Sequence, residues 1–346
     1  MRFSVSFPGG DTEYYLQSGY SQLLQVAPIA SSIIVTDTNV HRLYGHLFSE
    51  YRILIIEAGE KHKTWETIQL LAEKLAAFEA HKHTRLVGIG GGVVTDITGF
   101  LASIYMRGIA CSFVPTTVLS MVDAAIGGKN GINLGLYKNM LGNIRQPGFI
   151  LYDLSFLESL QEKEWSNGFA EIIKYACIGD AALFEELRAS TLTAYKIRPE
   201  KLNSLIQRCV QQKNEIVLAD EQENGIRKML NFGHTTGHAF ETLYHLQHGQ
   251  AVAFGMIVAL IASENILGIS TDLRQQLVQL LAQYALESRL RIDVEKVIDT
   301  VKRDKKRKDG TIDFILLAET GRALIEPVTF DQVRNALQIF ADEYKP

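Results

Sequence analysis

The sequence predicts an α/β domain built on a parallel sheet, followed by an all-helical domain. Two observations lead to this prediction: apolar, β-branched runs alternate with helical periodicity as far as about residue 150, and beyond Asp153 the pattern changes to helices. The chain has 346 residues, of which 47% are hydrophobic, and this is too long for one comfortable core. We therefore expect two domains, at residues 1–155 and 156–346.

The expected strands of the first domain end in polar residues. The strands are expected at 32–35, 53–56, 86–89 and 113–114, and the clearest helix at 64–78. Asp37 and Asn39 follow the first strand, and Glu60 and Lys63 follow the second. Ligands of parallel sheets bind beyond the carboxyl ends of the strands, so these residues are candidates for a binding site.

Three glycines, Gly90 to Gly92, follow the third expected strand, and Val93 and Asp96 then open a helix. Glycines at this place let backbone N–H groups approach a pyrophosphate, while the helix dipole favours the anion. An aspartate at a strand end, such as Asp37, can accept hydrogen bonds from ribose hydroxyls. This pattern predicts a dinucleotide site, although GGG is not the GxGxxG fingerprint and an ordinary tight turn explains it equally well.

The stretch 115–147 shows little periodicity and is rich in glycine and asparagine. It carries Asp123, Lys129 and Lys138 among retained apolar residues. We therefore expect an ordered, functional loop rather than a disordered linker.

Helices dominate the second half of the chain. We expect them at 162–178, 181–188, 202–218, 251–267, 273–286 and 294–301, with a strand at 312–317. Glu171 and Lys174 lie one turn apart in the first of these helices, where a solvated ion pair is the commoner explanation, although the neighbouring residues are apolar. The basic run 302–308 is expected to be a solvated face on an ordered loop.

Composition argues against several classes of partner. The net charge of −4 is small and mixed in sign, so no overall field favours nucleic acid or an anionic membrane. Cys111, Cys177 and Cys209 are too few and too widely spaced for a disulfide framework or a thiolate zinc site, and they are expected in the core. No apolar leader or membrane-spanning run is present, so we expect a soluble, cytoplasmic protein.

The segment 225–249 holds four of the nine histidines. His234 and His238 are four residues apart in a helical pattern, so both rings share one face, and His248 lies in a turn just beyond. A catalytic zinc usually takes three protein ligands, so two imidazoles would need a third partner, most naturally a carboxylate. The alternative is a set of histidines hydrogen-bonded near a core, and the residues alone do not decide which histidines are ligands.

Together these segments resemble the 3-dehydroquinate synthase family, from about Asp37 to Leu317. The resemblance rests on GGGVVTD, YMRG, VPTT, VDAAIGGKNGIN, the KN pair at 138–139, AEIIKY, LNFGHTTGHAFE, the HG pair at 248–249 and DKK from 304. It implies a Rossmann-like NAD domain, a helical domain, and one metal, zinc or cobalt, in the cleft between them. It also implies a homodimer that converts 3-deoxy-D-arabino-heptulosonate 7-phosphate into 3-dehydroquinate and phosphate.

The resemblance also assigns site residues. It makes Glu171, His234 and His248 the metal ligands and leaves His238 as a polar group on the substrate side. The implied catalytic and substrate-binding residues are Arg107 from the partner subunit, Asp123, Lys129, Asn139, Lys174, Lys213, Arg227, Asn231, His238 and Lys306. Lys305 is the alternative to Lys306 in the DKK segment. The implied NAD-binding residues are Asp37, Asn39, Glu60, Lys63, Gly91, Gly92, Val93, Asp96, Thr116, Thr117, Asp123, Lys129, Lys138, Asn139, Phe156 and Ser159.

The sequence also allows three alternatives. A sister sugar phosphate cyclase, of the 2-deoxy-scyllo-inosose or valiolone synthase type, would share the fold, the cofactors and the first chemical steps. The presence of Arg227, Asn231 and His238 together favours a substrate that bears a carboxylate. A metal-dependent polyol dehydrogenase would release NADH, and the set of anion-binding lysines argues against it. A non-enzymatic binding module would have no use for such an intact set of residues.

Overall fold

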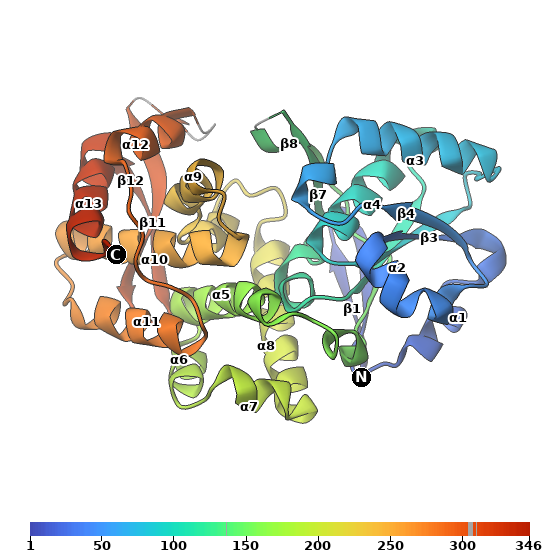
Figure 1. Ribbon diagram of the computed structural model, residues 1–346, viewed down its shortest axis with the longest axis horizontal. Coiled ribbons are helices and arrows are strands. Elements are labelled where there is room, and N and C mark those ends of the chain that lie inside the picture. The colour runs from blue at the N-terminus through green and yellow to red at the C-terminus, as the bar shows by residue number, and fades with distance from the viewer. Residues whose placement is uncertain (136, 304–306, 309) are drawn as a thin grey trace. The chain divides into compact units, whose positions relative to one another are not determined.

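The computed structural model describes residues 1–135, 137–303, 307–308 and 310–346, so Lys306 and the rest of the DKK segment lie outside the described residues. The chain forms two compact units (Figure 1). Unit 1 is Met1–Leu160 with Pro199–Gln222, and unit 2 is Gln161–Arg198 with Glu223–Pro346. The chain therefore passes from one unit to the other after residues 160, 198 and 222. The functional division between residues 155 and 156 stays a prediction.

Unit 1 is built on a seven-stranded sheet in the order β1-β2-β9-β6-β5-β3-β4. The strands are β1 (Arg2–Phe7), β2 (Gly10–Tyr15), β3 (Ser32–Asp37), β4 (Arg52–Ile56), β5 (Arg85–Gly90), β6 (Ala110–Pro115) and β9 (Phe149–Leu151). Every pairing from β2 to β4 is parallel, and β1 pairs antiparallel with β2. Strands β3, β5 and β6 are almost wholly buried, which explains the short apolar runs in their sequences. The predicted parallel sheet is thus confirmed.

The helices of unit 1 come from two distant parts of the chain. They are α1 (Leu23–Val26), α2 (Thr38–Tyr44), α3 (Trp65–Ala77), α4 (Gly92–Ile104) and α8 (Pro199–Ala219). Helix α8 and the residues that follow it are joined to the β1–β2 hairpin by two long-range hydrogen bonds. The Tyr14 hydroxyl donates to Asn214 Oδ1 over 2.7 Å, and the Gly9 N–H donates to Glu221 Oε2 over 2.9 Å. Helix α8 is therefore part of the α/β unit, although it lies beyond the predicted boundary.

The stretch that showed little periodicity contains a hairpin, β7 (Lys129–Leu134) with β8 (Tyr137–Ile144), and a π-helical turn, η6 (Ser120–Ala124). Gly131 faces Gly142 across the hairpin, and a Cβ on Gly142 would lie 2.6 Å from the Asn130 carbonyl oxygen. The close approach of the two strands requires small residues there. This is why the segment lacks the β-branched pattern by which strands are recognised.

Unit 2 is mostly helical and is organised around α10. Its helices are α5 (Glu162–Gly179), α6 (Ala181–Arg188), α7 (Leu192–Lys196), α9 (His234–Tyr244), α10 (His248–Leu267), α11 (Asp272–Gln283), α12 (Val294–Arg303) and α13 (Phe330–Glu343). Helix α10 packs against α5, α9, α11 and α13, and it is buried on all sides. By length and composition it is the one described helix that can cross a membrane, but most of it is buried inside the protein, as in a core helix.

A small antiparallel sheet accompanies these helices, in the order β10-β11-β12, so unit 2 is mostly helical and not all-helical as predicted. Its strands are β10 (Arg307–Lys308), β11 (Thr311–Glu319) and β12 (Arg322–Thr329). The sequence predicted residues 312–317 of β11. It did not predict β12, because Glu326 and Pro327 interrupt the pattern of that strand. The three cysteines are free and buried, as predicted, and burial raises the pKa of the Cys111 thiol to about 11.

Candidate active site

Three helices of unit 2 bring together a carboxylate and two imidazoles. Glu171 of α5, His234 of α9 and His248 of α10 each offer a ligand atom, and these atoms lie within 4.8 Å of one another. Glu171 Oε1 is 3.1 Å from His248 Nε2 and 3.4 Å from His234 Nε2. One carboxylate and two imidazoles are a donor set typical of a catalytic zinc, and they leave a further coordination position for water or substrate. The residues present therefore fit a divalent metal ion.

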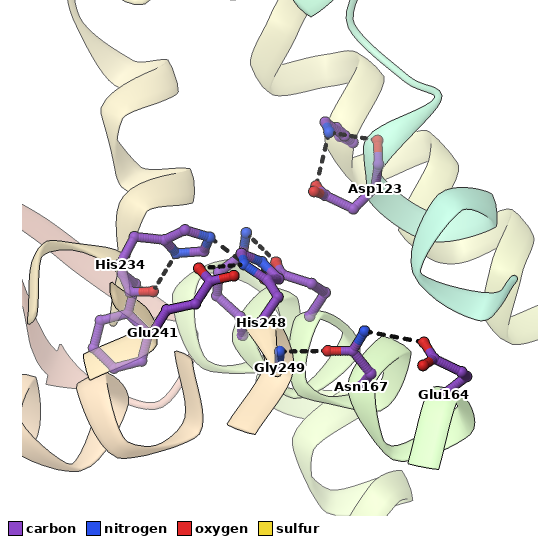
Figure 2. A network of polar contacts seen from close by, with 11 residues as sticks. Asp123, Glu164, Asn167, His234, Glu241, His248 and Gly249 are labelled. Carbon is purple, nitrogen blue, oxygen red and sulfur yellow. Dashed lines mark hydrogen bonds and ion pairs between the residues drawn. The ribbon is translucent and has the colours of Figure 1, made fainter. Parts of the chain in front are cut away.

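The second nitrogen of each imidazole also has a partner, which orients the ring. His234 Nδ1 lies 3.1 Å from the Phe232 carbonyl oxygen, so a proton on Nδ1 leaves the Nε2 lone pair directed at the group. His248 Nδ1 lies 3.6 Å from Glu241 Oε2, an ion-pair distance (Figure 2). Such outer partners fix the tautomer and the orientation of metal-binding histidines. Glu241 was not identified from the sequence.

Burial and charge act differently on the two imidazoles. Burial lowers the pKa of His234 well below its usual range and outweighs the attraction of Glu171, so the ring is neutral at pH 7, as a metal ligand must be. Burial also acts to lower the pKa of His248, but Glu171 and Glu241 outweigh it and raise this pKa to about 10. Metal binding at His248 would therefore release a proton.

Lys174 neutralises part of the buried carboxylate. Its Nζ contacts Glu171 Oε2 one helical turn away, and the lysine is only 1% exposed. The expected solvated ion pair is thus a buried one. Buried pairs are sensitive to the loss of one partner, because the remaining charge is left in a medium of low dielectric constant.

Helices α9 and α10 approach closely enough to bring their histidines together because small residues line the crossing. A Cβ on Gly255 would lie 1.8 Å from the Gly233 carbonyl oxygen, and one on Gly237 would lie 3.0 Å from the Ala251 carbonyl oxygen. Any larger residue at Gly255 would force the two helices apart.

His238 lies beside the metal-ligand group but outside it. Its ring centroid is 5.3 Å from that of His234 and 6.4 Å from that of His248, and the residue is exposed. The spacing of four residues thus places His238 next to His234 without making it part of the Glu171 cluster. Its role on the substrate side stays a prediction.

Two further predicted residues of unit 2 lie on the 3-10 segment η8 (Ile226–Asn231). Arg227 is buried, at 1% exposure, and Asn231 Nδ2 donates to Glu223 Oε1 over 2.8 Å. Glu223 was not identified from the sequence, because an acidic residue in the run DEQENG gives no distinguishing signal.

In unit 1 the glycine turn has the predicted place between β5 and α4. Gly91 is the N-cap residue of α4, and Gly92 and Val93 form the first turn. A Cβ on Gly90 would lie 2.4 Å from Val94 Cγ2, so glycine is required there. The backbone N–H groups at the start of this helix provide the kind of anion site that a pyrophosphate would use.

Asp37 has a structural role that the sequence did not predict. Its Oδ1 accepts hydrogen bonds from the N–H groups of Asn39 and Val40, at 2.8 and 2.9 Å, and so caps α2. Burial raises the pKa of this carboxyl group. A contact with ribose stays a prediction.

Lys63 joins several of the predicted NAD-binding residues of unit 1. Its buried Nζ contacts Asp96 Oδ2 and lies 2.6 Å from Asn139 Oδ1. Asn133 completes the group, because its amide nitrogen donates to Glu60 Oε1 over 2.8 Å and its oxygen accepts from the Asn139 N–H over 2.9 Å. Asn133 was missed because one asparagine among several in a glycine-rich loop carries no spacing signal.

The remaining predicted residues of unit 1 lie in five places. Lys213 Nζ is 2.7 Å from Asp123 Oδ1 (Figure 2), Lys129 and Lys138 are exposed on the β7–β8 hairpin, and Arg107 is exposed after α4. Thr116 and Thr117 follow β6, where the Thr116 N–H donates to the Gly90 carbonyl oxygen over 3.0 Å. The last two predicted residues, Phe156 and Ser159, both contact Tyr44. The Tyr44 hydroxyl is 2.8 Å from Ser159 Oγ, and its ring centroid is 4.8 Å from that of Phe156.

The sheet with its glycine turn and the helical unit with its Glu-His-His group define a protein of the dehydroquinate synthase-like fold class. The family model described as 3-dehydroquinate synthase N-terminal matches residues 53–167, and the one described as 3-dehydroquinate synthase C-terminal matches residues 168–307. The chain belongs to the 3-dehydroquinate synthase family. The resemblance, the fold class and the enzyme class predicted from the sequence are therefore confirmed.

Relatives and solved structures agree with this assignment. The 3-dehydroquinate synthase of Dehalococcoides mccartyi is 38% identical over 314 residues, 88% of each chain. That of Bacillus cytotoxicus is 39% identical over 291 residues, 83% of this chain and 78% of the relative. The 2-epi-5-epi-valiolone synthase of Streptomyces hygroscopicus, solved with NAD+ and Zn2+, has a TM-score of 0.86 at 28% identity and covers 98% of this chain and 97% of its own. A 2-deoxy-scyllo-inosose synthase, solved with carbaglucose-6-phosphate, NAD+ and Co2+, shares the fold, with a TM-score of 0.87 at 23% identity over 99% of both chains.

The Glu-His-His group predicts different effects of two histidine substitutions. His248→Ala is expected to lose stoichiometric zinc, because it removes an imidazole that faces Glu171. His238→Ala is expected to retain the metal, because His238 lies outside the ligand group. Metal content after dialysis against trace zinc measures both, and equal metal loss in the two variants would contradict the assignment.

The buried pair predicts that metal partly compensates for the loss of Lys174. Lys174→Met is expected to lower the free energy of unfolding of the metal-free chain by about 1–3 kcal/mol, because Glu171 loses a cationic partner. The loss should be smaller when zinc is bound, since the ion supplies positive charge to the same carboxylate. Thermal unfolding with and without zinc measures this difference. Lys228→Met is the control, because its pair with Asp313 is partly exposed and contributes about 1 kcal/mol at most.

Proposed function

We propose that this chain converts 3-deoxy-D-arabino-heptulosonate 7-phosphate into 3-dehydroquinate and phosphate, in the shikimate route to aromatic amino acids, with NAD and a divalent metal as cofactors. One observation supports this most. In a chain 38% identical to a curated 3-dehydroquinate synthase, Glu171, His234 and His248 place their ligand atoms within 4.8 Å of one another. The reaction comprises oxidation of one hydroxyl, elimination of phosphate, re-reduction, ring opening and intramolecular aldol closure.

The metal would be held by Glu171, His234 and His248, and it would supply a Lewis acid for the hydroxyl that is oxidised. Zinc or cobalt suits this donor set. Lys174 and Glu241 would hold the carboxylate and one imidazole in place from outside. His238, exposed beside this group, is suited to carry a proton to or from the substrate.

The NAD would lie along the carboxyl edge of the unit 1 sheet and would supply a hydride acceptor that is restored within each turnover. The glycine turn at Gly91 and Gly92 would take the pyrophosphate on backbone N–H groups. The remaining NAD-binding residues are proposed to be Asp37, Asn39, Glu60, Lys63, Val93, Asp96, Thr116, Thr117, Asp123, Lys129, Lys138, Asn139, Phe156 and Ser159.

A substrate with a phosphate and a carboxylate needs several cationic partners, although the chain as a whole carries a net charge of −4. The proposed substrate contacts are Asp123, Lys129, Asn139, Lys174, Lys213, Arg227, Asn231, His238 and Lys306. Lys213 is restrained by its pair with Asp123, and the guanidinium of Arg227 is suited to grip an oxyanion with two hydrogen bonds. Ring opening and closure then depend chiefly on holding the chain of the substrate in a reactive conformation.

We also propose a homodimer in which Arg107 reaches the phosphate site of the partner. Met106 and Arg107 both have positive φ angles, of 48° and 60°. Non-glycine residues adopt this conformation at a cost in energy, so it persists where surrounding contacts enforce it. Lys82 Nζ supplies such contacts, to the Met106 and Gly108 carbonyl oxygens at 3.2 and 2.5 Å, and the turn presents Arg107 outward. A cytoplasmic location, without nucleic-acid or membrane partners, completes the proposal.

A sister cyclase activity is the second candidate, because valiolone and inosose synthases share the fold closely. Arg227, Asn231 and His238 favour the carboxylate-bearing substrate over theirs. A polyol dehydrogenase activity is the third candidate, and it would release NADH.

The substrate assay separates these activities. With the heptulosonate phosphate, NAD and zinc, the chain is expected to release phosphate without net formation of NADH, because the hydride returns in each turnover. Phosphate is measured colorimetrically and NADH by absorbance. A heptulose phosphate without the carboxylate and glucose 6-phosphate serve as controls. Preference for either control would indicate a sister cyclase, and steady accumulation of NADH would indicate a dehydrogenase.

The shared phosphate site predicts complementation between two inactive chains. Arg107→Ala and Lys129→Ala are each expected to be nearly inactive alone. Mixed dimers should regain about a quarter to a half of the activity per chain, because one of the two sites then has all its residues. Activity after co-refolding measures this, and the absence of any recovery in verified mixed dimers would contradict the contribution of Arg107 across the interface.

A further inference from the structure

The helix that carries His248 begins at this residue, and the residue just before it does not cap the helix with its side chain. Gln247 is the N-cap residue of α10 and makes no side-chain cap hydrogen bond. The first N–H groups of a helix have no partner within the helix and need acceptors from elsewhere. For the residue after His248, the acceptor comes from another helix.

Asn167 of α5 supplies that acceptor, as Figure 2 shows. Its Oδ1 accepts the hydrogen bond from the Gly249 N–H, and its Nδ2 donates to Glu164 Oε2 over 3.4 Å. Glu164 in turn accepts from Gln247 Nε2 over 3.2 Å through its other oxygen. The residues on both sides of His248 are therefore bound to the same stretch of α5.

Close backbone packing reinforces these bonds. A Cβ added to Gly249 would lie 2.4 Å from the Asn167 carbonyl oxygen and 2.7 Å from its Cα. The first turn of α10 therefore rests directly on the backbone of α5, and glycine is required at 249. Asn167 is itself 9% exposed and Gly249 is buried, so water has little access to this contact.

The same helix carries the carboxylate of the Glu-His-His group. Glu164, Asn167 and Glu171 are spaced by three and four residues, which places them on one face of α5. A single rigid helix thus sets the position of Glu171 and also holds the turn that bears His248. The distance of 3.1 Å between Glu171 Oε1 and His248 Nε2 depends on both.

We infer that Asn167 is a positioning residue of the metal site, which fixes His248 relative to Glu171 through the Gly249 N–H, with Glu164 holding its amide. This inference rests on the proposed metal site. Asn167 does not contact the ligand atoms of the metal site, so its effect passes through the backbone of α10. Loss of outer partners of this kind typically weakens metal binding about 10-fold to 100-fold.

The test is the affinity of the metal-free chain for zinc, measured by competition with a zinc-binding dye. Asn167→Ala is expected to weaken zinc binding by about 10-fold or more. The double variant Asn167→Asp with Glu164→Gln keeps the net charge, the acceptor for the Gly249 N–H and a hydrogen bond between the two side chains. It is expected to bind zinc within about threefold of the unaltered chain.

A matched control separates positioning from general loosening of α10. Ser263 lies in the same helix, where its buried hydroxyl donates to the Ala259 carbonyl oxygen over 2.8 Å and accepts from the Leu317 N–H over 3.0 Å. Ser263→Ala is expected to lower the melting temperature of the metal-free chain and to leave its zinc affinity unchanged. Equal weakening of zinc binding by Ser263→Ala and Asn167→Ala would overturn the inference.

Two further outcomes are decisive. An unaltered chain that takes up no zinc overturns both the proposed function and this inference. A chain that binds zinc through His248, and binds it equally well as Asn167→Ala, overturns only the positioning role. If Asn167→Ala does not fold, Glu164→Ala replaces it, because it removes both supporting bonds at a partly exposed position. It is expected to weaken zinc binding in the same direction, and unchanged affinity in that variant would count against the role of Asn167.

Discussion

A single buried carboxylate constrains the architecture of unit 2. Glu171 lies where water does not reach, so its charge has to be met by groups that the fold brings to it. Lys174 comes from the next turn of the same helix, and the imidazoles come from two other helices. The glycines at the α9–α10 crossing permit the necessary approach. The packing of the helices therefore sets the positions of the groups around Glu171, and a change in that packing would change the site.

Unit 1 meets a similar requirement in a different way. Its polar residues gather where parallel strands end, and there they are linked by hydrogen bonds that run between segments far apart in the sequence. Lys63 links α4 to the β7–β8 hairpin, and Asn133 links that hairpin to the turn after β4. A loop that looked irregular in the sequence is thus ordered, and it carries several of the predicted cofactor-binding residues. Its order comes from side-chain amides and lysines together with buried apolar residues such as Val118, Val122 and Ile132.

Secondary structure was predicted best where a single physical requirement determines the pattern of a continuous segment. Buried parallel strands favour short apolar runs, so β3, β5 and β6 were visible, and amphipathic helices such as α3 show their period directly. The β7–β8 hairpin was missed because Gly131 and Gly142 face each other across it, and β12 because Glu326 and Pro327 interrupt it. Spacing placed His234 and His238 on one face, but it did not show which ring would face Glu171, 63 and 67 residues earlier in the chain. Glu241, Glu223 and Asn167 were missed for the same reason, since their roles arise only from tertiary contacts.

The path of the chain between the two units has a consequence for its synthesis. Unit 1 includes Pro199–Gln222, so the first 160 residues emerge from the ribosome without α8 and without the acceptors at Asn214 and Glu221. The sheet can form early, but the β1–β2 hairpin does not have both partners until Glu221, 61 residues after residue 160, has been translated. Nascent chains of this protein therefore expose an incomplete α/β unit while unit 2 is only begun, and this is the interval in which chaperone binding would matter most.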